Sequence, residues 1–297
     1  MAQDRLAALV GDGSVMLRSP SGEELVSLNH DIPLVPASIL KIPLAQVALA
    51  TLGEDFRFET HFYRNDSDDL LIRGLGDPFL VSEEIARIAD TLAERGLQQI
   101  RRLVMDDSAF EPNPDLPIES GSDQPYAARN SALAVNFNTV NLAWAADGRL
   151  ITGETQTPLT ALAGELGAEL SQGEMQRINL GDDPASGLRQ AQQLFRHFLI
   201  ESGITVSDAD FHQQAVTDEW SLFYSHRSSQ SLRDNLDGML RYSNNFIANQ
   251  LFLTLGAQTS GYPATTEAAR AALQQVLAEL YGDSFGRDPQ SLLMLEG

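Results

Sequence analysis

The sequence contains no cysteine among its 297 residues. This absence excludes disulfide bonds, thiolate metal sites and a cysteine nucleophile. It leaves the redox compartment open, because a chain without cysteine is compatible with either environment. The length and a hydrophobic content of 43% suffice for a buried core without covalent cross-links. The composition is therefore that of a folded globular protein.

Lysine is almost as scarce, because only Lys41 among the 20 basic residues is a lysine and all the others are arginines. The 41 acidic residues outnumber the basic ones, and the formal net charge is −21. Such a charge repels phosphate backbones and anionic membrane surfaces, and the sequence has no local basic patch that would offset it. We therefore expect no nucleic-acid partner.

Long apolar runs are absent as well. No stretch approaches the roughly 20 apolar residues that span a bilayer. The first residues, 1–5, lack the basic and apolar regions of a signal peptide. The sequence predicts no transmembrane segment and leaves two alternatives open. One is a cytoplasmic protein, and the other is the mature part of an exported protein whose signal has been replaced by Met1.

Motifs for metals and nucleotides are also missing. The only lysine is followed by Ile42, which excludes a phosphate-binding loop with Gly-Lys-Ser/Thr, and Gly74-Leu75-Gly76 does not continue as a dinucleotide fingerprint. The histidines are too dispersed for a zinc-binding pair at helical spacing. They are His30, His61, His197, His212 and His226. We therefore expect no metal and no cofactor.

Hydrophobic periodicity predicts a mixed α/β protein. Residues 14–29 alternate around a Ser-Pro-Ser-Gly turn and predict a hairpin, and residues 37–52 predict the first strong helix. Ser82 is the expected N-cap of a later helix. The further expected elements are strands at about 56–71, 100–105, 133–144 and 150–152, a proline-rich loop at 111–125, and helices at about 82–96, 184–203, 229–256 (one or two) and 266–281.

Ser38 and Lys41 lie at the start of the first strong helix. Three residues apart, they share one helix face, so their side chains can meet. A serine hydroxyl is a weak nucleophile unless a neighbouring base takes its proton, and an amine can do so when burial and nearby positive charge lower its pKa. Arginine essentially never deprotonates, so a chain that otherwise uses arginine still needs lysine for this task. The pattern predicts a Ser38 nucleophile with Lys41 as its base.

Ser243-Asn244-Asn245 forms a second polar group. Ser243 is expected on the apolar stripe of its helix, between Leu240 and Ile247, where a hydroxyl is costly unless it has a partner. A Ser-x-Asn triplet is common by itself. Its value lies in its pairing with Ser-x-x-Lys, since the two motifs together are typical of penicillin-binding proteins and serine β-lactamases.

Other segments make the resemblance more specific. The chain resembles the low-molecular-mass class C penicillin-binding proteins, which are the D-alanyl-D-alanine carboxypeptidases and endopeptidases of peptidase family S13. The resemblance runs from about residue 10 to the end, and the long separation between the two motifs fits a family that inserts an extra domain there. The matching segments are 36–41, 52–58, 74–78, 106–110 and 243–245.

The resemblance implies an α/β (α+β) fold with two parts. Residues 1–62 and 225–297 would form a serine β-lactamase or penicillin-binding-protein-like catalytic domain, and residues 63–224 an inserted mixed α/β domain. The implied partners are peptidoglycan stem peptides that end in D-Ala-D-Ala and β-lactam antibiotics. The implied location is the periplasm.

The resemblance also implies a mechanism. Ser38 would attack the D-Ala-D-Ala carbonyl to form an acyl-enzyme, with Lys41 as the base. Ser243 and Asn245 would relay protons and hold the substrate. Two alternatives remain open, a non-catalytic peptidoglycan-binding or scaffold protein derived from this fold and a serine β-lactamase.

The sequence departs from the family pattern at three points. Pro43 stands within the expected catalytic helix, and Asn244 stands where the family often has aspartate. No Lys-Thr/Ser-Gly follows Ser243. We therefore expect a C-terminally truncated enzyme of very low activity, whose catalytic domain contains only the N-terminal hairpin of its sheet.

Overall fold

The computed structural model describes residues 2–112, 114, 116, 119–168, 170, 173 and 175–282. The chain divides into two compact units, one up to Leu40 and one from Lys41 onward. The predicted N-terminal hairpin is confirmed. The elements of the first unit are α1 (Ala2–Val10), the antiparallel strands β1 (Val15–Arg18) and β2 (Glu24–Leu28), and the 3-10 turn η1 (Ala37–Leu40).

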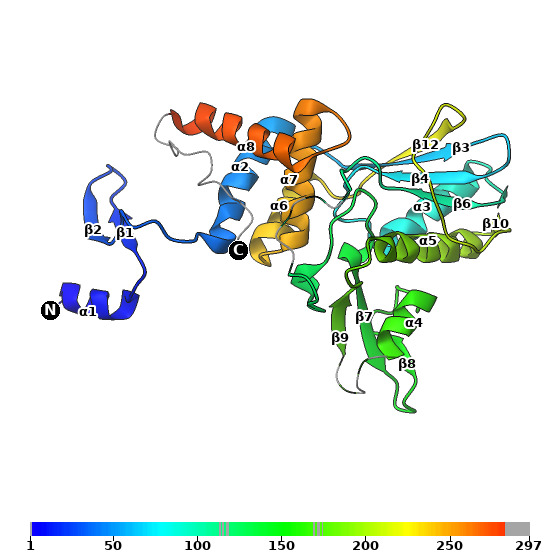
Figure 1. Cartoon of the computed structure of the whole chain (residues 1–297), viewed down its shortest axis with the longest axis horizontal. Helices are drawn as coiled ribbons and strands as arrows, with labels where there is room; N and C mark the ends of the chain where they lie inside the picture. Colours follow the sequence, from blue (N-terminus) through cyan, green and yellow to red (C-terminus); the bar gives the residue numbers. More distant parts are fainter. Residues whose placement is uncertain are drawn as a thin grey trace. The chain divides into compact units, whose positions relative to one another are not determined.

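A mixed five-stranded sheet is the main layer of the second unit (Figure 1). The first three strands in its order run parallel, and the last two join antiparallel. The order is β11 (His212–Gln213), β6 (Leu103–Asp106), β4 (Leu70–Gly74), β3 (Glu59–Arg64) and β12 (Ser221–Arg227). Strand β12 was not predicted from the sequence.

A turn divides the single strand that was predicted at 56–71 into β3 and β4. The side chain of Asn65 accepts hydrogen bonds from the backbone N–H groups of Ser67 and Asp69, both at 3.0 Å. Asp68 adopts a φ of 58°, in the left-handed region that aspartate tolerates better than most residues. Asparagine and aspartate favour such turns because their side chains replace backbone partners.

Two helices cover one face of the large sheet, α3 (Ser82–Glu94) and α5 (Pro184–Glu201) (Figure 1). Their apolar stripes form the main core together with the sheet. The predicted cap of α3 is wrong, because Val81 occupies the N-cap and Ser82 is the first helical residue. The Ser82 hydroxyl instead contacts Thr157 and Asn136, each at 2.9 Å.

A smaller three-stranded sheet has the order β8 (Leu150–Thr152), β7 (Thr139–Trp144) and β9 (Gln176–Asn179), and α4 (Ala161–Ala168) packs on it. The strand predicted from residue 133 begins only at Thr139. The reason is the short turn η3 (Asn136–Asn138), whose three residues all have positive φ. A short parallel pair, β5 (Gln99–Ile100) and β10 (Thr205–Val206), and the turn η2 (Pro125–Ala127) complete the strands and turns of the described part of the chain.

Four helices form the remaining block of the second unit (Figure 1). They are α2 (Lys41–Leu52), α6 (Leu232–Arg241), α7 (Asn245–Ser260) and α8 (Thr266–Tyr281). The run predicted as one or two helices at 229–256 is therefore two. Ser243 lies in the break between them, with a φ of 53°, and not on a helical stripe as predicted.

The two ends of the predicted insert fall inside paired strands. Phe62 of β3 pairs with Tyr224 of β12, so residues on both sides of each predicted boundary share one sheet. The division into residues 1–62 with 225–297 and 63–224 stays a prediction.

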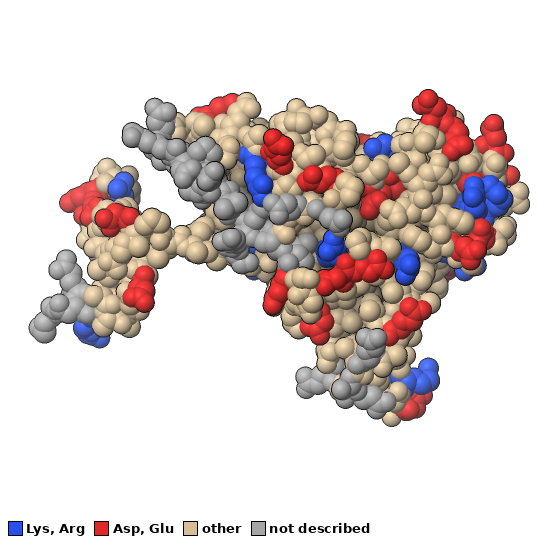
Figure 2. Space-filling model, viewed as in Figure 1, with Lys and Arg blue, Asp and Glu red and all other residues tan. Residues whose placement is uncertain are grey.

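The surface is acidic but mixed. On the face drawn in Figure 2, acidic side chains lie among arginines over much of the described surface. None of the helices in the described part of the chain has the length and apolar character that crossing a bilayer requires.

Candidate active site

Lys41 is the first residue of α2 and is only 8% exposed. Its Nζ donates a hydrogen bond of 2.7 Å to Oδ1 of Asn245, which lies 204 residues away in the sequence. Burial lowers the pKa of the Lys41 ammonium group, because removal from water disfavours the charged form. The structure thus brings the lysine of one predicted motif into direct contact with the asparagine of the other.

Asn245 is held at the first position of α7. Asn244 is the N-cap of that helix, and its side chain accepts a hydrogen bond of 3.0 Å from the backbone N–H of Ile247. The N–H of Asn244 in turn donates to the carbonyl of Met239 in α6, at 3.0 Å. This capping fixes the direction in which α7 leaves the break and therefore the place of Asn245.

Ser243 occupies the tightest point of the same break. Its positive φ belongs to a region that costs a non-glycine residue of the order of 1 kcal/mol. Its side chain is exposed. Ser243 is thus the residue just before the cap of α7, and the structure presents its hydroxyl at the surface of the helical block.

Ser38 belongs to the other unit, in the 3-10 turn η1. The predicted helix over 37–52 is confirmed as a 3-10 turn followed directly by α2. Ala37, just before Ser38, has a φ of 46°, and backbone of this kind is most often found at functional sites. Because α2 starts at Lys41, Pro43 lies in the first turn of this helix. In the first turn of an α-helix the missing N–H of a proline costs no hydrogen bond.

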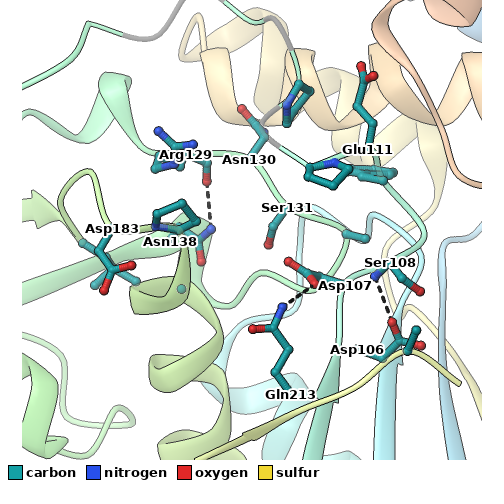
Figure 3. Close-up of a pocket in the computed structure, with 18 of the residues that line it drawn as sticks. Asp106, Asp107, Ser108, Glu111, Arg129, Asn130, Ser131, Asn138, Asp183 and Gln213 are labelled. Carbon is teal, nitrogen blue, oxygen red and sulfur yellow. Dashed lines mark hydrogen bonds between the residues drawn. The ribbon is translucent and has the colours of Figure 1, made fainter.

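A cavity of about 490 Å³ lies between β6, the start of α5 and the segment that follows β11 (Figure 3). It includes part of the segment 106–110 that contributed to the resemblance. Among the described residues of its lining, the carboxylates outnumber the cations, of which Arg129 is one, so the lining favours a cationic or hydrogen-bond-donating group. The polar residues of its lining include Asp106, Asp107, Ser108, Glu111, Arg129, Asn130, Ser131, Asn138, Asp183 and Gln213.

Asp107 is the most perturbed group in this cavity. Burial raises the pKa of its carboxyl, although Gln213 donates a hydrogen bond of 3.1 Å to it (Figure 3). The neighbouring Asp106 accepts from the N–H groups of Ser108 and Val216, at 2.8 and 2.9 Å. Asp106 therefore shapes the loop, while Asp107 faces the cavity.

A buried carboxylate, Glu84 of α3, organises the crossing from β12 to α6. It accepts hydrogen bonds from the backbone N–H of Ser229 at 2.9 Å and from the Ser229 hydroxyl at 2.7 Å, and it contacts His226 at 2.7 Å. Burial by itself would raise the pKa of Glu84, but these bonds outweigh it and lower the pKa to about 2. This group was not predicted from the sequence, since its members are far apart in the chain.

Metal ligation has no structural support in the described ranges. No group of three or more histidine, aspartate or glutamate side chains is placed there to hold an ion.

The chain is similar in sequence to a known family and to a curated protein. A profile of the D-Ala-D-Ala carboxypeptidase 3 (S13) family matches residues 3–179 and 182–285. The D-alanyl-D-alanine carboxypeptidase of Actinomadura sp. (strain R39) is 28% identical over 325 residues. That alignment covers 92% of this chain and 59% of the curated relative, so the chain spans about three fifths of its length.

Solved structures show the same fold. Penicillin binding protein 4 from Haemophilus influenzae superposes with a TM-score of 0.75 at 18% identity, over 98% of this chain and 74% of that chain. Its complex with a β-lactam superposes with a TM-score of 0.67 at 18% identity, over 98% of this chain and 73% of that chain. The predicted fold, of the penicillin-binding-protein kind, is confirmed.

Proposed function

The chain belongs to the D-Ala-D-Ala carboxypeptidase 3 (S13) family, and on that premise we propose that it acts as a serine-type D-Ala-D-Ala carboxypeptidase or endopeptidase on peptidoglycan stem peptides. Its site residues are Ser38, Lys41, Ser243 and Asn245. β-Lactam antibiotics acylate the same serine. The reaction takes place outside the cytoplasm, in the periplasm, where these peptides are found.

The observation that carries this proposal is the hydrogen bond of 2.7 Å from Lys41 to Asn245. A buried lysine with a lowered pKa is costly for a fold and useful for proton transfer. The chain uses arginine for its other cations, and arginine could not serve here. The contact also joins the two motifs on which the sequence hypothesis depends.

The reaction begins with transfer of the Ser38 hydroxyl proton to the neutral amine of Lys41. Asn245 Oδ1 accepts one N–H of that amine, which orients the nitrogen lone pair. Ser38 Oγ then bonds to the carbonyl carbon of the penultimate D-Ala, and the peptide bond to the terminal D-Ala breaks. The leaving amine takes up a proton, relayed from Lys41 through Ser243.

Water completes the cycle. The same lysine accepts a proton from water, and the resulting hydroxide attacks the acyl-enzyme carbonyl. The ester bond to Ser38 breaks as Lys41 returns that proton to Ser38 Oγ, and the shortened peptide leaves with a free carboxylate. A β-lactam follows the first half of this path, because its strained amide opens to give an ester on Ser38 that the site releases slowly.

Covalent trapping tests the proposal. We expect prolonged incubation of the chain with benzylpenicillin to give one adduct by intact-mass spectrometry, located on Ser38 by peptide mapping. Ser38→Ala is the matched control and should give none. A chain that never acquires the adduct, or an adduct that persists in Ser38→Ala, would contradict the proposal. Rapid release of hydrolysed penicillin would instead favour the serine β-lactamase alternative.

A further inference from the structure

Asn130 fastens the first turns of α7 to the segment that precedes η3. Its side chain is only 6% exposed. Nδ2 donates to the carbonyl of Phe246 and to Oε1 of Gln250, both at 3.1 Å, and Oδ1 accepts from Asn249 at 3.2 Å. Phe246 directly follows Asn245, so Asn130 holds the peptide unit next to the lysine-binding asparagine.

Phe137 supports the same turn through its ring. It packs edge-on against Phe246 with ring centroids 6.0 Å apart, and edge-on against Phe79 at 5.9 Å. Aromatic rings in this geometry attract one another beyond the effect of area burial alone. The three rings therefore form a row that ends at the residue after Asn245.

The backbone at Phe137 is strained. Its φ is 60°, and those of Asn136 and Asn138 are 48° and 50°. Asparagine tolerates this region, whereas a residue as bulky as phenylalanine rarely adopts it. A glycine would adopt the same φ without steric cost, so the position retains phenylalanine for its ring and not for its backbone.

The surrounding structure holds the strained turn in place. The side chain of Asn136 accepts from the N–H of Ser82 and donates to its hydroxyl, both at 2.9 Å. Asn138 donates from Nδ2 to the carbonyl of Arg129 at 2.8 Å (Figure 3). Strain of this kind persists only where neighbouring contacts determine the conformation, and it is most often found at functional sites.

We propose that Asn130 and Phe137 are positioning residues for Lys41, because they hold the first turn of α7 so that Asn245 Oδ1 stays within hydrogen-bond distance of the lysine amine. The expected effect on catalysis rests on the proposed function. The structural part of the inference, the control of Lys41 through Asn245, does not depend on that function.

The single lysine permits a direct measurement. Protein labelled with [ε-¹³C]lysine gives one lysine resonance, whose titration by NMR reports the pKa of Lys41 without any substrate. In Asn130→Ala and Phe137→Ala we expect this pKa to rise toward that of an exposed lysine, because a loosened α7 admits water to the amine. We expect acylation by benzylpenicillin at neutral pH to slow about tenfold or more, since small misplacements can cost about 10²-fold.

Two matched controls separate positioning from general packing. Asn179→Ala also removes a buried amide whose Nδ2 makes two hydrogen bonds, to the carbonyls of Ser122 and Gln124. Phe211→Ala also removes a half-buried ring, one that packs on the main core beside Arg189. Both should leave the pKa of Lys41 unchanged and the acylation rate within about twofold of the parent, because the hydrogen bonds described for Asn179 and the core and ring contacts described for Phe211 do not involve α7.

The conservative variant Phe137→Leu keeps an apolar group against Phe246 and should recover most of both parameters. If Phe137→Ala does not unfold cooperatively and is therefore not properly folded, Phe137→Leu tests the positioning role of Phe137 in its place. A Lys41 pKa that is unchanged in Asn130→Ala and in the Phe137 variants would overturn the proposal. A parent protein that benzylpenicillin never acylates would count against the proposed function, while the lysine titration would still decide the positioning role.

Discussion

Lys41 is a residue that arginine, the other strongly basic side chain, cannot replace in the proposed reaction. Burial lowers its pKa, and Asn245 accepts its hydrogen bond. At a given pH, a larger fraction of such an amine is neutral and able to accept a proton than of an exposed lysine. A guanidinium in the same place would keep its charge at every accessible pH.

Lys41→Arg should therefore abolish acylation of Ser38 while the fold persists. We expect a loss of at least about 10²-fold, the lower range of general base catalysis. In the parent, acylation should increase with pH up to a pKa below that of free lysine, because only the neutral amine accepts the serine proton. Stopped-flow or gel-based measurement with a fluorescent penicillin gives the rates.

Lys41→Met is the companion variant, since it removes the base and suits a buried position better than the larger guanidinium. Circular dichroism and thermal unfolding should show a folded protein for both. If either variant were acylated at a rate close to that of the parent, Lys41 would not be the base.

The junction of α6 and α7 is a sharp break between two helices, and it orients Asn245. Tyr242 closes α6 as its C-cap, Ser243 turns the chain with a positive φ, and Asn244 caps α7. If α6 continued as one helix, the direction of the Asn245 side chain would follow from the helical rotation of about 100° per residue. The break therefore sets which way Asn245 faces, and periodicity cannot reveal this because the apolar stripes continue on both sides.

Asn244→Ala should lower the free energy of unfolding by about 1 kcal/mol, because the N–H of Ile247 loses its side-chain acceptor. Asn244→Asp is the control, since a carboxylate also caps a helix. It should stay within about 0.5 kcal/mol of the parent. Urea denaturation measures both, and equal stability of the parent and the alanine variant would show that the cap contributes nothing.

At the scale of the whole second unit, buried charges between β4, α3 and β12 link the large sheet to the helices. Asp77 is 3% exposed, and burial raises its pKa to about 6, with the Glu84 carboxylate acting in the same direction and His226 opposing it. Glu84 behaves in the opposite sense, because its hydrogen bonds lower its pKa to about 2. The two carboxylates therefore affect stability in different pH ranges.

Asp77 should make the protein less stable as the pH rises from about 4 to about 6. In this window the native state keeps a proton that the unfolded chain has lost, so the unfolded state gains relative to the native one. The increase of this pKa to about 6 corresponds to a loss of about 3 kcal/mol, the last part of which occurs as the pH rises past 6.

Chemical denaturation at a series of pH values measures this effect. The difference between the parent and Asp77→Asn should change most between about pH 4 and about pH 6 and become constant only by about pH 7. Glu84 contributes the opposite slope below its own unfolded pKa, and it interacts with Asp77 in the parent, so the slope above about pH 5, where Glu84 is ionised in both states, reports Asp77. A difference that is constant over the whole range would show that Asp77 titrates normally.

The sequence by itself determined several of the local elements and the candidate chemistry. The helices at 184–201 and 266–281 and the strand at 150–152 follow from periodicity, because each presents one apolar face to the core. The lone lysine three residues after a serine, together with Ser-x-Asn, predicted the residues of the candidate site. These signals are local, and a linear chain carries them in full.

Only the tertiary structure decided which distant residues meet. Strand β12 pairs with β3 although α3, α4 and α5 lie between the two strands in the sequence, and Lys41 contacts Asn245 across 204 residues. The strained turn at Asn136–Asn138 and the Glu84 group likewise depend on partners from several elements. Such contacts follow from the packing of the whole core, in which each buried polar group must find its partner, and no spacing within the sequence encodes that choice.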